Sequence, residues 1–138
     1  MTITRRISAV GIVACVLALA VLPARGEKED HDYEVTDPSA VYLGSGKHPG
    51  SPAVISADKV WAEIPEYKTV LEEGLTDEDA RYHLLMKKAT RRFEEALVKE
   101  AKRESYDLIA ELGAVKALKK GKKIPSATAG MIELVSRD

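Results

Sequence analysis

The chain has little cysteine and few large aromatic side chains. Among its 138 residues are one Cys, one Trp and one Phe, beside five Tyr. One thiol cannot form a disulfide within the chain, so packing alone must stabilise the fold. A chain of this length builds one domain, and so few large side chains indicate a thin core that gains from self-association.

Residues 1–26 have the pattern of a secretory signal peptide. A pair of arginines precedes an uncharged apolar run over residues 7–22, and the small residues Ala24 and Gly26 follow it. The run of about 16 residues is short for a membrane span, which needs about 20. We therefore expect cleavage after Gly26 and export to the periplasm.

Three other interpretations of this segment remain open: an uncleaved membrane anchor, a twin-arginine signal, and a lipoprotein signal at Cys15. The apolar run continues past Cys15, whereas a mature lipoprotein should turn polar there. Cleavage would remove three arginines and no acidic residue, so the net charge would change from −1 to −4. An exported chain with this acidic balance argues against a nucleic-acid partner.

Residues 27–52 show no apolar periodicity. Residues 27–38 are acidic and residues 41–52 are rich in Gly and Pro, so we interpret the whole segment as a disordered tail and linker. Gly44–His48 resembles a phosphate-binding loop superficially, but it lacks the first Gly and the Ser or Thr after the Lys. The folded domain is accordingly predicted over residues 53–138.

The predicted fold class is α+β, with a small sheet of three short strands, a helical hairpin whose second helix is long, and a short C-terminal helix. Gly74 ends the first helix, which Pro65 breaks, and Thr76 is expected to cap the second. The elements are a strand at 53–56, the broken helix up to Gly74, a long helix over 76–105, strands at 106–110 and 114–118, and a helix after Ser126.

The long helix carries an apolar stripe at helical spacing, formed by Tyr82, Leu85, Met86, Ala89, Phe93, Ala96 and Leu97. The broken first helix is too short to cover this stripe, and an exposed apolar patch usually marks an interface. Trp61 is expected to pack in the core against the long helix or the sheet. Leu84 and Val98 lie on the opposite face of the long helix. The residues predicted to bind polypeptides or to form an oligomer interface are Leu84, Leu85, Met86, Phe93 and Leu97.

No catalytic, cofactor or metal site is predicted. His31, His48 and His83 lie in three separate segments without ligand spacing, and the acidic residues of the hairpin turn are explained by helix capping. The basic residues Lys87, Lys88, Arg91 and Arg92 are interpreted as a solvated helix face paired with neighbouring glutamates, including a Glu95–Lys99 pair.

Three segments, in this order, resemble the OmpH/Skp family of periplasmic chaperones: Val54–Lys68, Ala101–Ile109 and Ile124–Thr128. The resemblance covers about residues 53–135. It implies a trimer with a small sheet and an apolar-lined space for unfolded outer-membrane proteins. The first helical arm ends at Gly74 here, so the arms are far shorter than those of the family.

From these observations we expect an exported, non-enzymatic, chaperone-like protein of the periplasm. Its expected partners are unfolded or outer-membrane-bound polypeptides and further copies of itself, a trimer by resemblance, and contact with a membrane surface remains open. The alternative is a structural or adaptor subunit of a cell-envelope complex with one fixed partner.

Overall fold

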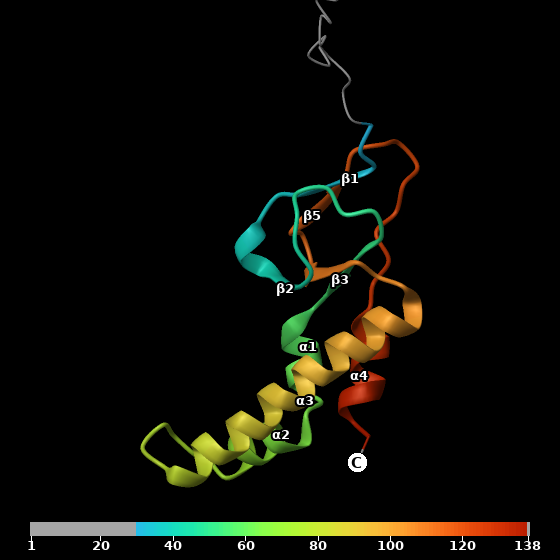
Figure 1. Cartoon of the computed structure of the whole chain (residues 1–138). Coiled ribbons are helices and arrows are strands. Elements are labelled where there is room, and N and C mark those ends of the chain that lie inside the picture. Colours follow the sequence, from blue (N-terminus) through green and yellow to red (C-terminus); the bar gives the residue numbers. More distant parts are fainter. Residues whose placement is uncertain (1–29, 138) are drawn as a thin grey trace, which may run out of the picture. The chain divides into compact units, whose positions relative to one another are not determined.

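The computed structural model describes residues 30–137, and the predicted α+β class is confirmed (Figure 1). The predicted signal peptide lies outside the described residues. The strands are β1 (Tyr33–Val35), β2 (Val41–Leu43), β3 (Pro52–Ile55), β4 (Leu108–Glu111) and β5 (Val115–Ala117). The helices are η1 (Pro38–Ala40), α1 (Ala57–Trp61), α2 (Pro65–Glu72), α3 (Ala80–Glu104) and α4 (Thr128–Val135).

The strands form two small sheets. In the three-stranded sheet, β4 lies between β2, to which it is antiparallel, and β3, to which it is parallel. A parallel pair needs a long crossover connection, and α1, α2 and α3 supply it. The second sheet pairs β1 with β5 in antiparallel register. β4 is the central strand of the three-stranded sheet because it pairs with both β2 and β3.

Alternate residues of β3 and β4 face two different cores. Ala53, Ile55 and Ile109 belong to the core shared with the helices. Leu108 and Ala110 belong to a second core under β1 and β5. Because side chains alternate between the faces of a strand, burial on both sides removes the apolar–polar alternation from β4.

The prediction that residues 27–52 are disordered is wrong for the part that the structure describes. This segment contains β1, η1 and β2, so the folded domain begins about twenty residues earlier than expected. Tyr33 and Val35 are buried, and the Val35 N–H donates to the carbonyl of Lys47 over 2.7 Å. The acidic neighbours of these two residues hid a strand in which only one face is apolar.

The glycine-rich loop after β2 is held by a carboxylate. Both Asp107 oxygens accept backbone N–H groups, from Gly50 over 2.7 Å and from Ser51 over 3.0 Å. Gly44 has a φ of +88°, and a Cβ there would overlap the carbonyl oxygen of Asp107. This loop is therefore a close-packed connection to the start of β4.

The helical hairpin forms largely as predicted. Pro65 is the first residue of α2, and Gly74 follows its end with a φ of +61°. However, α3 begins at Ala80 rather than after Thr76. The Thr76 N–H donates to Asp79 Oδ2 over 2.9 Å, so the expected capping bond closes a separate turn before the helix.

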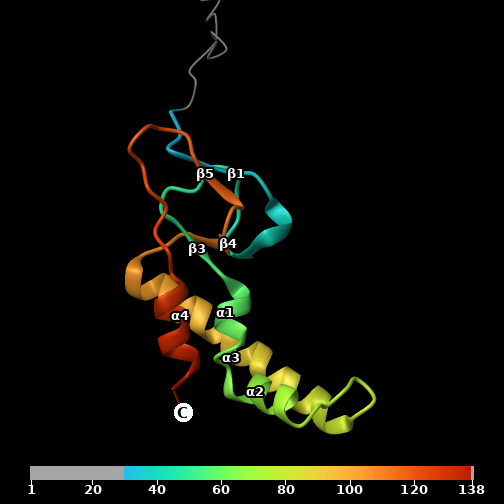
Figure 2. The ribbon, with the colours of Figure 1, turned by 180° about the vertical axis from the view of Figure 1, so that it is seen from behind.

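Two helices cover different halves of α3. α2 lies along its N-terminal half, and α4 lies along its C-terminal half (Figures 1 and 2). Ser105 ends α3 in the left-handed conformation, with a φ of +58°. This arrangement decides which α3 side chains remain accessible.

Candidate functional site

Four aromatic rings form a continuous row from β2 to α2. Trp61 stacks on Phe93 with ring centroids 5.3 Å apart, and Tyr67 meets Trp61 edge-on at 5.6 Å. Tyr42 meets the other end of the row, edge-on to Phe93 at 5.6 Å. The row therefore contains the only Trp and the only Phe of the chain. The prediction that Trp61 packs against the long helix is confirmed.

A cavity of about 540 Å³, here called the apolar groove, adjoins this row between α1, α2 and α3. Trp61, Tyr67 and Met86 are half-buried along it, whereas the Leu71 side chain is 61% exposed. Asp58 is the single charged residue of the lining. The lining consists of Asp58, Trp61, Ala62, Tyr67, Leu71 and Met86.

The structure separates the five predicted binding residues. Phe93 and Leu97 are only 5% and 4% exposed and lie in the core of the single chain, so the prediction that they form a contact surface is wrong. Met86 lines the apolar groove, Leu85 is half-buried, and Leu84 is 54% exposed. As expected, Val98 is also exposed.

The C-terminal part of the apolar stripe, which comprises Ala89, Phe93, Ala96 and Leu97, is buried in a core to which α4 contributes. Met131 and Val135 of α4 are fully buried in the same core as Phe93 and Leu97. The expectation of an exposed stripe rested on the length of the first helix, and the alternative that the C-terminal helix folds back on the stripe agrees with the packing of α4 against α3. The groove residues Tyr67 and Leu71 were missed, although their i, i+4 spacing on one face of a helix was visible.

Tyr42 fixes the β2 end of the aromatic row. Its hydroxyl donates to Glu111 Oε2 over 2.8 Å, and the same oxygen accepts the Ala57 N–H over 3.1 Å. Burial and the neighbouring Glu111 carboxylate raise the pKa of Tyr42 to about 12. The phenol therefore stays protonated and acts as a hydrogen-bond donor that links β2, β4 and the start of α1.

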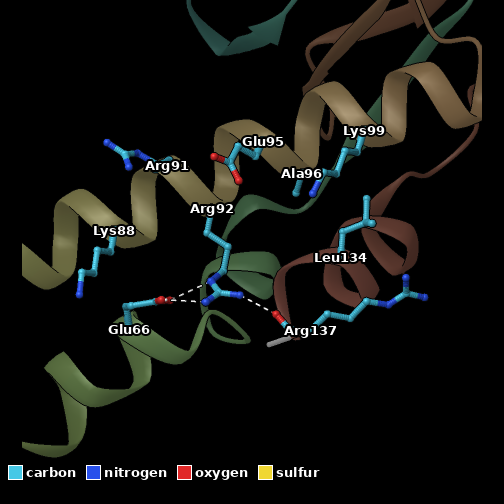
Figure 3. A pocket seen from close by; sticks show the side chains of 9 residues that line it. All are labelled: Glu66, Lys88, Arg91, Arg92, Glu95, Ala96, Lys99, Leu134 and Arg137. Atoms are coloured by element: carbon cyan, nitrogen blue, oxygen red, sulfur yellow. Dashed lines mark hydrogen bonds and ion pairs between the residues drawn. The ribbon is translucent and has the colours of Figure 1, made fainter.

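A second cavity of about 570 Å³, here called the basic groove, lies between α2, α3 and α4 (Figure 3). Arg92 of α3 donates to both oxygens of Glu66 of α2, over 3.0 and 2.8 Å. A third nitrogen of Arg92 donates to the Arg137 carbonyl over 2.6 Å. The hydrogen bonds from Arg92 hold the pKa of the Glu66 carboxyl below its ordinary value. Arg92 therefore links α3 to Glu66 of α2 and to backbone carbonyls at the C-terminal end of α4.

Two of the three histidines meet in the fold. The rings of His31 and His48 stack with centroids 3.8 Å apart, and His48 Nδ1 lies 3.1 Å from the carbonyl of Tyr33. His83 Nε2 lies 2.6 Å from the carbonyl of Asp77. Within residues 30–137, no group of three or more His, Cys, Asp or Glu could hold a metal ion.

No protein-family model matches the chain, and no match was found among curated proteins or solved structures. In the part of the chain that the structure describes, no helix is long and apolar enough to cross a membrane. The resemblance to the OmpH/Skp family, and the functions that it implies, therefore remain predictions.

Proposed function

We propose that the chain is an exported, non-enzymatic, polypeptide-binding protein of the periplasm that holds an apolar segment of another chain in the apolar groove. The observation that carries this proposal is the accessible surface of Trp61, Tyr67, Leu71 and Met86 beside one another. Aromatic and Met side chains are enriched at protein contacts, and the flexible thioether adapts to different partners.

The size and lining of the apolar groove indicate which kind of polypeptide segment would fit it. Its volume of about 540 Å³ holds a few side chains rather than a folded domain. Asp58 supplies a carboxylate, and aromatic faces such as those of Trp61 and Tyr67 attract cations. The fitting segment is therefore extended or helical, with large apolar side chains next to a Lys or Arg.

Two classes of function use such a groove. A chaperone would bind many unrelated unfolded chains, including outer-membrane proteins, through short apolar segments. A specific observation favours the second candidate, an adaptor with one fixed partner: Phe93 and Leu97 are buried, so the remaining apolar surface is small. The breadth of binding separates the two classes.

The test uses the processed chain and a panel of unrelated polypeptides unfolded in urea, among them outer-membrane β-barrel proteins. Leu71→Asp places a charge in the groove, and Leu112→Asp is the matched control because Leu112 is 68% exposed and lies in the β4–β5 turn. Suppressed aggregation of the panel that Leu71→Asp abolishes, and Leu112→Asp retains, supports the chaperone.

If no chain of the panel is bound, the chaperone is excluded. A synthetic apolar peptide with flanking lysines then decides the proposal. Saturable binding that depends on Leu71 supports the adaptor. If neither the panel nor the peptide binds, or if both variants bind as well as the wild type, the proposal is wrong.

A further inference from the structure

The basic groove is a separate site from the apolar groove. On α3, Met86 lines the apolar groove and Glu95 lines the basic groove, and nine residues at 100° each place them about 180° apart. The basic groove is lined by Glu66, Lys88, Arg91, Arg92, Glu95, Ala96, Lys99, Leu134 and Arg137. Five of these residues are basic and two are acidic, in a chain whose overall charge is −1.

Three of the five basic residues that line the basic groove take part in no ion pair of the described residues. Arg92 and Glu66 neutralise one another, and Arg137 pairs with Glu133 at the end of α4. Within residues 30–137, no ion pair includes Lys88, Arg91 or Lys99. The expected Glu95–Lys99 pair is thus not formed. Glu95 remains as the single uncompensated carboxylate of the lining.

The charged residues that α3 contributes to the basic groove lie on one side of the helix. Lys88, Arg92, Glu95 and Lys99 recur at i, i+4, i+7 and i+11, which is one face of a helix. Lys88 and Lys99 extend from α3 on either side of the Arg92–Glu66 pair, and Lys99 reaches toward Leu134 (Figure 3). Lys88 and Arg91 are like charges at i and i+3, a spacing at which they repel one another, and a bound anion would relieve that repulsion.

We propose that the basic groove binds a phosphate group. A phosphate carries more than one negative charge and several acceptor oxygens, which match the Lys88 ammonium and the neighbouring Arg91 guanidinium better than a single carboxylate does, while Lys99 faces the rest of the ligand. The Arg92–Glu66 pair forms a neutral base for the site, and Ala96 and Leu134 offer apolar surface to the rest of the ligand. The phosphate comes from a free phosphate ester or from a phospholipid headgroup.

The experiment titrates the processed chain by calorimetry at constant ionic strength with inorganic phosphate and with glycerol phosphate. In a second arm, co-sedimentation measures binding to phosphatidylglycerol vesicles and to phosphatidylcholine vesicles. Constant ionic strength matters because salt screens exposed charges. Saturation by the small phosphates indicates a free ester, and binding to anionic vesicles alone indicates a headgroup.

The matched variants each remove three positive charges. Lys88→Gln/Arg91→Gln/Lys99→Gln changes the groove, and Lys59→Gln/Lys87→Gln/Lys102→Gln changes exposed lysines outside its lining. We expect at least a tenfold loss of affinity in the first and little change in the second. If the triple variant does not fold, Arg91→Glu alone is measured in its place, and we expect it to lose affinity as well. Absence of binding in both arms, or an equal loss in the control, overturns the proposal.

Discussion

The indole ring of Trp61 stacks on the phenyl ring of Phe93, with centroids 5.3 Å apart and ring planes 23° apart. Trp61 ends α1, and Phe93 lies in the middle of α3, so the contact joins the short first arm of the hairpin to the long one. Because Trp61 is only half-buried, its remaining surface lines the apolar groove. One side chain thus serves both the core and the candidate site.

Trp61→Ala should lower the free energy of unfolding by about 2–3 kcal/mol, somewhat less than the loss of a fully buried Trp, because part of the ring is already accessible. Urea unfolding followed by circular dichroism measures this difference. Val98→Ala is the control, since Val98 is 43% exposed and an exposed truncation should cost less than about 0.5 kcal/mol. An equal effect of the two substitutions would contradict the packing role of Trp61.

Phe93→Asp should unfold the chain rather than dissociate an oligomer. Its side chain is 5% exposed among apolar neighbours, and a buried unpaired carboxylate costs several kcal/mol. Leu84→Asp, at a position 54% exposed, should leave the fold intact. Light scattering of the wild type and of Leu84→Asp then tests self-association, which remains a prediction. A folded Phe93→Asp chain would refute the burial of this residue.

Gly130→Ala should destabilise the chain although alanine is the better helix former by about 1 kcal/mol. A Cβ at Gly130 of α4 would overlap the carboxylate of Glu100 on α3, which is 3% exposed and pairs with Arg103 over 2.6 Å. We expect a net loss of about 1–3 kcal/mol in chemical unfolding, as overpacking typically costs. Adding Glu100→Ala should recover part of that loss, because the two substitutions share one contact. A more stable Gly130→Ala chain would show that α3 and α4 are not closely packed there.

The Arg92–Glu66 pair should make the free energy of unfolding depend on pH in the acidic range. Hydrogen bonds from Arg92 place the folded-state pKa of Glu66 below its ordinary value of 4.5. A carboxyl with a depressed folded pKa contributes stability above the unfolded pKa, and this contribution is lost as the pH falls through the folded pKa. The free energy of unfolding should therefore drop below about pH 4.5 more steeply in the wild type than in Glu66→Gln. Glu72→Gln, an exposed control on α2, should keep the wild-type slope.

Local signals predicted most of the helical part of the fold. Pro65 and Gly74 mark the start and end of α2 as expected, because each restricts or permits a backbone conformation on its own. β1 was missed because its pairing partner, β5, lies about eighty residues away in the sequence. Asp32, beside β1, forms ion pairs with Lys119 at 2.7 Å and Lys122 at 3.0 Å, so charges that indicated a solvated tail are used in tertiary contacts.

The candidate site was predicted less well than the fold. Amphipathic spacing correctly placed Phe93 and Leu97 on an apolar face, but spacing does not say which element covers that face. Trp61 of α1 and Tyr42 of β2 pack on Phe93, and Met131 and Val135 of α4 complete the same core. Met86 remained accessible because it lies beyond the reach of α4, next to α2. Exposure is thus a property of tertiary packing that single-helix patterns cannot provide.

The most direct test of polypeptide binding is the fluorescence of Trp61, because it is the only Trp in the chain and lines the apolar groove. The titrant is a short Trp-free peptide of Leu and Phe residues flanked by lysines. We predict a saturable blue shift of the Trp61 emission as the peptide excludes water from the indole, and at least a tenfold weaker affinity for Leu71→Asp than for Leu112→Asp. An emission spectrum that does not change with peptide, or the same affinity in both variants, would contradict the proposed function.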